Sequence, residues 1–342
     1  MLEIDGSYGE GGGQILRNAV AFSTLTETPI KITKIRSNRP NPGIKAQHYT
    51  AIKSIQELCN ADTKGLDIGS STLEFKPGDF RSGVYKFDIG TAGSITLVFQ
   101  ACILASLKTD SPVTIRITGG TDTKWSPPWD YFQHIFIPLI KKTGVLVDAQ
   151  LIKRGYYPKG GGEASITINP CNTDLKPLQL DKEQKFFEVN GIINIAGLPD
   201  HISKRIKHKA IEILLKKNLK ANVDVEQTSA FSPGTGLTLW TESEDTILGS
   251  TSLGEKGLPS EEIGRIAALN LLNEIESYAT LDINAFDQLL PYMAIAKGFS
   301  SCFVQKISGH AQTNMWLIKQ FFDVKFETKQ EEKNIKISIN HL

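Results

Sequence analysis

The sequence has 342 residues, of which 40% are hydrophobic and 22% are charged, and its formal net charge is +1. This length allows roughly two or three globular domains, and the near-zero net charge argues against a protein that binds nucleic acid through an overall basic surface. Any nucleic-acid site must therefore be a local cluster of lysine and arginine side chains.

The first part of the chain alternates β-prone segments with apolar helices. It predicts a strand, a glycine-rich loop leading into a helix, a second strand, a second helix and two short strands, at 1–5, 6–26, 29–35, 44–58, 66–68 and 72–75. The same order recurs at 84–89, 90–107, 112–118, 131–142, 145–152 and 164–168. This repetition, with a period of about eighty residues, predicts two similar structural units.

A different order of elements begins at Phe186. Strands and helices alternate there at 189–195, 201–217, 223–226, 236–243, 246–253 and 260–278, and the first order then resumes at 279–283, 286–296, 300–307, 310–322, 324–329 and 334–339. We therefore predict an α+β fold of three repeated β-α-β-α-β-β units, with a smaller α/β domain inserted at the third unit. The predicted boundaries are 1–185 and 279–342 for the repeated units and 186–278 for the inserted domain.

The four cysteines, Cys59, Cys102, Cys171 and Cys302, lack the CxxC spacing of a structural zinc site. Their positions favour small buried thiols of a reducing compartment, and the sequence leaves open whether any of them pair. Acidic residues among the first five positions argue against a signal peptide, and no apolar run approaches the roughly 20 residues of a membrane span. We expect a cytoplasmic protein without a membrane segment and leave its oligomeric state open.

His310 lies where a β-prone run gives way to a helix. The run that ends at Ile307 is broken by Ser308-Gly309, and helical spacing of apolar residues follows. A helix N-terminus favours bound anions and lowers the pKa of an imidazole, which suits a histidine that attacks phosphorus. This segment alone favours a capping or core histidine, so the interpretation depends on the rest of the chain.

Two other segments carry candidate phosphate ligands. GEGGGQILR supplies Glu10, Gln14 and Arg17, and a loop of bare N–H groups beside an arginine can hold phosphate while a carboxylate there can hold a divalent metal. IRSNRPNPGIKAQH places Arg36, Arg39, Lys45 and His48 in one turn and the helix after it. Such a basic cluster is either a solvated surface or a ligand site. The glycine loop lacks the GK[ST] of a P-loop, so alone it is a weak signal.

RGYYPKGGGEA, at Arg154–Ala164, is a second triple-glycine loop, and it lies between two predicted strands. It fits either a hairpin with close backbone contact or a phosphate contact.

Together these motifs resemble the RNA 3'-terminal phosphate cyclase family nearly from end to end. The family's glycine signature matches RGYYPKGGG, with Ala164 where an aliphatic residue is usual. GEGGGQILR, IRSNRPNPG with the later QH, GTAGSITLVFQ, GGTD with a following SPP, and FDQLLPYMA match in the same order. The short segment that carries the family's nucleophile stands here as HAQTN, which assigns the nucleophilic role to His310.

The resemblance implies an activity and a fold. Such an enzyme converts an RNA 3'-terminal phosphate to a 2',3'-cyclic phosphate with ATP and a divalent metal, Mg²⁺ or Mn²⁺, through a covalent histidine–AMP intermediate and an RNA-adenylate. The implied fold has three units of the type found in the C-terminal domain of bacterial translation initiation factor three and in enolpyruvyl transferases, plus the inserted domain.

The resemblance also implies roles by position. Glu10 matches the metal-binding carboxylate, and His48 with Arg39 matches contacts to the RNA phosphate. The residues matching the nucleotide site are Arg17, Arg36, Arg39, Gln100, Pro127, Asp287 and Gln288. One departure is Asn284, which stands where the family has an aromatic that stacks on adenine, and whether Phe286 replaces it is left open.

Two other functions remain as alternatives. One is a ribosome-biogenesis protein of the same fold that binds RNA without catalysis, although eukaryotic relatives of that kind lack the nucleophilic histidine. The other is an enolpyruvyl transferase-like enzyme, which would not need an adenylylated histidine. The inserted domain contains none of the matched residues. Its helix at 201–217 carries Lys204, Arg205 and Lys207 off the apolar stripe, and we expect a solvated face more than an RNA contact.

Overall fold

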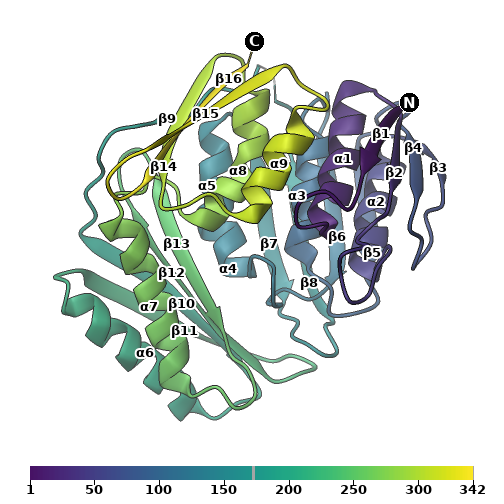
Figure 1. Cartoon of the computed structure of the whole chain (residues 1–342). Helices are drawn as coiled ribbons and strands as arrows, with labels where there is room; N and C mark the ends of the chain where they lie inside the picture. Colours follow the sequence, from purple (N-terminus) through teal and green to yellow (C-terminus); the bar gives the residue numbers. More distant parts are fainter. Residues whose placement is uncertain (172–173, 342) are drawn as a thin grey trace.

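The computed structural model describes residues 1–171 and 174–341, arranged as four four-stranded sheets with helices packed against them (Figure 1). The first sheet has the order β1-β2-β4-β3, with β1 parallel to β2 and the other neighbours antiparallel. Its elements are β1 (Leu2–Asp5), α1 (Gly13–Thr26), β2 (Ile30–Thr33), α2 (Ala46–Leu58), β3 (Asp62–Lys64) and β4 (Leu73–Lys76). The predicted strand at 66–68 is wrong, because β3 ends at Lys64 and Gly65 turns with a positive φ of 77°.

The second sheet repeats this order and these strand directions as β5-β6-β8-β7. Its strands are β5 (Gly83–Asp88), β6 (Val113–Gly119), β7 (Val147–Lys153) and β8 (Gly162–Ile168). Between them lie α3 (Ile95–Ala105) and a continuous helical segment formed by α4 (Trp129–Tyr131), a five-residue π-helical stretch (Phe132–Phe136) and α5 (Ile137–Lys142). The single helix predicted at 131–142 is therefore present, but it begins earlier, at Trp129, and contains a π-helical stretch.

The third sheet corrects one predicted strand. Its order is β9-β14-β16-β15, formed by β9 (Gln179–Leu180), β14 (Phe299–Val304), β16 (Ile335–His341) and β15 (Val324–Gln330), with α8 (Ile283–Ile295) and α9 (Gly309–Ile318). We predicted that residues 279–283 form the strand beside β14. The strand that pairs with β14 there is instead β9, which precedes the inserted segment. The 279–283 segment instead ends in Asp282, which caps α8 by accepting hydrogen bonds from the N–H groups of Asn284 and Ala285.

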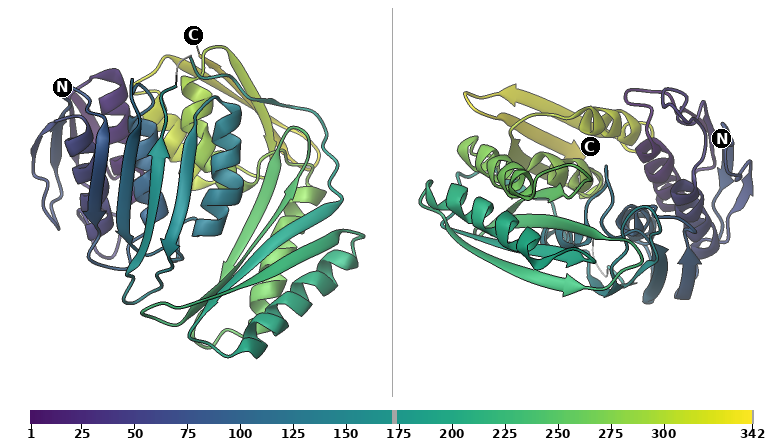
Figure 2. Two further views of the ribbon diagram at one scale, coloured as in Figure 1. Left: turned by 180° about the vertical axis from the view of Figure 1, so that it is seen from behind. Right: turned by 90° about the horizontal axis from the view of Figure 1, so that it is seen from below.

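The fourth sheet has a different order, β11-β10-β12-β13. It is formed by β10 (Glu188–Ala196), β11 (Lys220–Thr228), β12 (Gly234–Glu242) and β13 (Ile247–Leu253), and its helices are α6 (Asp200–Leu215) and α7 (Ser260–Glu276). These elements bury their own hydrophobic cluster, separate from the main one. Figure 2 shows α6 and α7 packed side by side against one face of this sheet.

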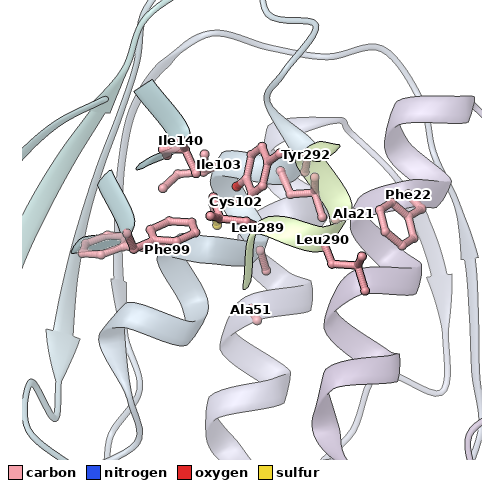
Figure 3. Packing of buried hydrophobic residues seen from close by; sticks show 14 of the residues in the cluster. Ala21, Phe22, Ala51, Phe99, Cys102, Ile103, Ile140, Leu289, Leu290 and Tyr292 are labelled. Atoms are coloured by element: carbon pink, nitrogen blue, oxygen red, sulfur yellow. The ribbon is translucent and has the colours of Figure 1, made fainter. Parts of the chain in front are cut away.

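The main core forms where helices from different sheets meet. Helices α1, α2 and α3 contact one another, α8 packs on α9, and α5 packs on α8. Figure 3 shows apolar side chains from these helices packed together, including Phe22, Phe99, Ile103, Leu289 and Tyr292. Three of the cysteines, Cys59, Cys102 and Cys302, are buried here, and burial raises the pKa of each thiol. No helix within the described residues is long and apolar enough to cross a membrane.

Buried acids lie where the fourth sheet meets the main core. Asp282 accepts a hydrogen bond from Tyr131 at 2.7 Å and one from the Gly249 N–H at 2.9 Å. Nearby, Glu274 on α7 is 6% exposed, and its Oε2 has no hydrogen-bond partner among the described residues. Burial, reinforced by the nearby Asp282 carboxylate, raises the pKa of Glu274 from 4.5 to about 8. The folded protein therefore holds a proton here that the unfolded chain releases above about pH 4.5.

Glu274→Gln is expected to stabilise the protein at alkaline pH. The raised pKa means that the unfolding free energy of the wild type falls as pH rises from about 4.5 to about 8. A neutral amide removes this loss, so the variant should be more stable above pH 8 by on the order of 5 kcal/mol and nearly unchanged below pH 4.5. Urea unfolding at both pH values measures the difference. Glu276→Gln is the matched control, because Glu276 is exposed on the same helix and pairs with Lys217. Equal effects at both pH values would contradict the buried, protonated Glu274.

Candidate functional site

One cavity of about 1200 Å³ lies between the main core and the fourth sheet. Its walls come from the glycine loop before α1, the turn before α2, α3, the loop after β6, the start of α8, the start of α9, and β13. Every site residue predicted from the sequence lines this cavity: Glu10, Arg17, Arg36, Arg39, His48, Gln100, Pro127, Asp287, Gln288 and His310. Segments nearly 300 residues apart in sequence thus form one chemical site.

His310 is the second residue of α9, as the sequence predicted. Ser308 caps this helix by accepting a hydrogen bond from the Ala311 N–H at 2.9 Å. The imidazole Nδ1 lies 3.1 Å from Gln14 Oε1 and 3.2 Å from Glu10 Oε2. Both partners are acceptors, so Nδ1 carries the proton and Nε2 keeps its lone pair. Burial lowers the pKa of His310, although Glu10 opposes this effect, and the ring is therefore largely neutral at pH 7.

The Glu10 carboxylate lies between the guanidinium of Arg39 and the imidazole of His310. Arg39 Nη2 lies 3.3 Å from Glu10 Oε2, the same oxygen that faces His310. The main chain of Gly309 also lies close, since a Cβ at this position would be 2.5 Å from Glu10 Oε1. The contact fixes the carboxylate against the first turn of α9.

Basic side chains surround His48 on another wall of the cavity. His48 Nδ1 accepts a hydrogen bond from the Lys45 N–H at 3.3 Å, which leaves Nε2–H as a donor. Burial, and then the positive charges of Arg17, Arg36 and Lys45, lower the pKa of His48 to about 3. Burial also lowers the pKa of Arg17 to about 10, and Arg17 pairs with no carboxylate among the described residues. A neutral imidazole among unneutralised cations is a site for an anion.

A third wall carries the residues predicted for the nucleotide. Gln100 donates a hydrogen bond to Gln288, and Gln288 donates to the Asn284 carbonyl at 2.9 Å. Asp287 accepts a hydrogen bond from Ser308 at 2.6 Å, and burial raises the pKa of Asp287 to about 7. The Asp287–Ser308 bond joins this wall to the start of α9.

The structure shows whether Phe286 can replace the aromatic residue expected at position 284. Phe286 is fully buried in the core and does not face the cavity, whereas Asn284 lines it. No aromatic ring from α8 residues 284–288 is therefore available for stacking in this structure.

The residues present fit a divalent cation that is held partly by a bound phosphate. Glu10 Oε2 and Gln14 Oε1 both contact His310 Nδ1, so a cation bound by Glu10 would lie beside the histidine. No group of three or more His, Cys, Asp or Glu side chains suited to a metal exists in the described part of the chain. Mg²⁺ is often held by one carboxylate plus substrate phosphates, so a single glutamate fits that mode better than a metal cage.

The fourth sheet contributes to the cavity, which the sequence motifs did not indicate. Thr251, Ser252 and Leu253 of β13 and Glu255 beyond it line the cavity, and Glu255 Oε2 lies 2.5 Å from Lys124 Nζ in the opposite loop. Alternating polar residues in 246–253 identify a strand but not the surface that it faces.

The second triple-glycine loop is a hairpin between β7 and β8 and does not line the cavity. Arg154 at its start is 1% exposed and donates hydrogen bonds to Asp122, Asp130 and Glu226. Of the two interpretations that the sequence left open, the hairpin is confirmed. Arg154 ties both ends of the loop that contains Pro127 to β11 of the fourth sheet.

The helix predicted to carry a solvated basic face is α6. Lys204 and Arg205 are exposed, Lys207 is half-buried, and Arg205 pairs with Glu261 at 2.6 Å. The apolar stripe is also present, with Ile206 and Ala210 fully buried.

Comparisons with known proteins identify one family. The sequence profile of the RNA 3'-terminal phosphate cyclase family matches residues 8–328. An RNA 3'-terminal phosphate cyclase of Methanosarcina mazei is 42% identical, covering 99% of this chain and 100% of the relative. Proteins of the same name from Pyrococcus furiosus and Nitrosospira multiformis are 41% and 40% identical, covering 96% and 98% of this chain and 95% and 96% of theirs. The chain therefore belongs to the RNA 3'-terminal phosphate cyclase family.

Proposed function

We propose that this protein is an enzyme that uses ATP to convert the 3'-terminal phosphate of RNA into a 2',3'-cyclic phosphate. The observation that carries the proposal is the placement of His310 at the start of a helix, in the lining of a cavity that also contains Arg17, Arg36 and Arg39, with Nδ1 engaged by Gln14 and Glu10 so that Nε2 is left for attack. Family membership supports the same activity.

His310 is the nucleophile in this proposal. The Nε2 lone pair attacks the α-phosphorus of ATP, a P–N bond forms, and the bond to pyrophosphate breaks. The developing positive charge on the ring is stabilised through Nδ1–H, which faces Gln14 and Glu10. An oxygen of the RNA 3'-phosphate then attacks the same phosphorus, and the P–N bond breaks. Finally the 2'-hydroxyl attacks the 3'-phosphorus, loses its proton, and AMP leaves as the ring closes.

Glu10 is the residue that would hold the divalent metal, Mg²⁺ or Mn²⁺. Such a cation, when bound, neutralises charge on the phosphates and polarises the α-phosphorus. Glu10 also has a second role in this chain. Its carboxylate faces the Nδ1–H of His310 and so fixes the orientation of the imidazole ring.

The remaining site residues bind the two substrates. Arg39 and the Nε2–H of His48 contact the RNA phosphate, while Arg17 and Arg36 contact phosphates of the nucleotide. Gln100, Pro127, Asp287 and Gln288 form the pocket for its nucleoside. Asp287 is half-protonated near pH 7 because its pKa is about 7, so it is able to donate or accept a hydrogen bond there.

We also infer how the chain is divided. The three sheets with the same strand order are three copies of the unit found in the C-terminal domain of translation initiation factor three, and 186–278 is a separate inserted domain. The repeated units carry the covalent chemistry, and β13 of the inserted domain closes one side of the cavity.

Incubation with ATP labelled at the α-phosphate tests the function. The purified protein should retain label covalently, and addition of an RNA 3'-phosphate should remove the label and yield a cyclic end. A non-catalytic RNA-binding protein or an enolpyruvyl transferase would retain none. Failure to label at any concentration of Mg²⁺ or Mn²⁺ would overturn the proposed function.

A further inference from the structure

Three large aromatic side chains stand exposed on loops near the cavity. Trp125 is 95% exposed, Tyr157 is 78% exposed and Phe231 is 61% exposed. No other aromatic ring stacks on any of the three among the described residues. Exposed aromatic rings of this size contribute nothing to the core, and a group of them on one surface is typical of a binding site.

Direct contacts connect the three loops. The backbone of Asp122, three residues before Trp125, forms a β-bridge with Tyr156, the neighbour of Tyr157. A Cβ at Gly161 would lie 2.3 Å from the Phe231 ring, so the glycine loop and this ring touch. The loops of the second and fourth sheets therefore form one continuous surface.

Trp125 connects this surface to the cavity. It is part of the cavity lining, on the same loop as Pro127. Its φ of 62° is uncommon for a residue with a side chain, and the loop that imposes it is anchored at both ends by Arg154 through Asp122 and Asp130. A bulky ring is thus held outward at the rim of the cavity.

Positive charges accompany the rings. Lys153 Nζ lies 3.5 Å from the centroid of Phe231, and Lys159 is exposed two residues after Tyr157. The acidic side chains of these loops are already paired, Asp122 and Glu226 with Arg154, Glu163 with Arg116 and Glu255 with Lys124. Aromatic rings spaced among lysines match the bases and phosphates of a single strand of nucleic acid.

We propose that Trp125, Tyr157 and Phe231 form an aromatic track for the single-stranded RNA that leads to the 3'-phosphate. The direction of the RNA strand along this track rests on the proposed function, which places the 3'-phosphate in the cavity. Trp125 stacks on a base next to the 3' end because it lines the cavity, and Phe231 contacts bases further upstream. The lysines contact the intervening phosphates.

Cyclisation of RNA 3'-phosphates of graded length, from two to about ten nucleotides, tests the track. A stacked base contributes roughly tenfold or more to binding, so Trp125→Ala should raise KM about tenfold for all lengths. Phe231→Ala should raise it only for the longer RNAs. Trp125→Phe should retain most of the wild-type KM. Labelling by ATP alone should be unchanged in Phe231→Ala, because Phe231 does not line the cavity.

Phe187→Ala is the matched control, because Phe187 is 73% exposed but precedes β10 at the end opposite Phe231. The nine residues of β10 separate the two ends of the sheet by about 30 Å. If the track variants bind and cyclise every RNA like wild type, the proposal is wrong.

Two further measurements distinguish an RNA track from a contact between two copies of the chain. Fluorescence anisotropy of a labelled RNA 3'-phosphate measures binding directly, so the track remains testable even if labelling by ATP fails and the proposed function is wrong. Sedimentation of the same variants detects a dimer. If Trp125→Ala or Phe231→Ala dissociates a dimer without weakening RNA binding, the surface is an interface between two copies and the track is overturned.

Discussion

His310→Ala is expected to abolish covalent labelling by α-labelled ATP, with a loss of roughly a thousandfold or more. His310 lines the cavity at the start of α9 with Nε2 left for attack, and alanine leaves no nucleophile in its place. Since His310 is half exposed and lies outside the core, the variant should fold normally. Label retained on the denatured protein, measured after gel electrophoresis, gives the result.

His208→Ala serves as the control for this variant, because His208 is exposed on α6 and does not line the cavity. It should label like wild type. Undiminished labelling of His310→Ala would remove this residue from the mechanism.

The sequence predicted which residues would lie together at the site, but it did not predict how their side chains contact one another. The motifs around Glu10, Arg39, His48 and His310 predicted residues that all line one cavity, because each lies at a glycine-rich or proline-rich break next to a helix, where local sequence signals are strong. Their partners were not visible in the same way. That Gln14 and Glu10 share the proton of one imidazole depends on the packing of α1 against α9, which no local pattern encodes.

The third sheet shows where strand prediction from sequence fails. ATLDI alternates as a strand should, yet Thr280 N–H donates to the Phe303 carbonyl at the end of β14, and Asp282 caps α8 instead. The strand that replaces it, β9, has only two residues, Gln179 and Leu180. A strand this short is stabilised by its partner across a separation of more than one hundred residues and carries no periodicity of its own.

Arg154 shows why the role of a charged residue is hard to predict from sequence alone. In sequence, an arginine before three glycines fits a phosphate contact as well as a structural role. In the fold it is 1% exposed and neutralised by carboxylates from three different segments, Asp122, Asp130 and Glu226. A buried arginine needs such partners, and only the tertiary structure supplies them.

Glu10→Ala is expected to reduce labelling by ATP about a hundredfold or more, and added metal should restore part of the loss. A carboxylate next to phosphates repels the nucleotide unless a cation lies between them, so loss of Glu10 weakens metal binding at this point. The measurement is the rate of labelling across a range of Mg²⁺ and Mn²⁺ concentrations. Glu3→Ala is the control, because Glu3 is exposed on β1 outside the cavity.

Glu10→Gln separates the metal role from the effect on His310. The negative charge of Glu10 raises the pKa of His310, against the larger lowering by burial, so a neutral amide should lower that pKa further. Because the nucleophile is the neutral ring, wild-type labelling should decline only below the ordinary imidazole pKa of 6.5, and in Glu10→Gln the decline should move to still lower pH. The plateau rate should nevertheless fall, since the amide binds a divalent cation weakly. A decline that moves to higher pH would contradict the contact between Glu10 and His310, and a normal plateau at every metal concentration would contradict the metal role of Glu10.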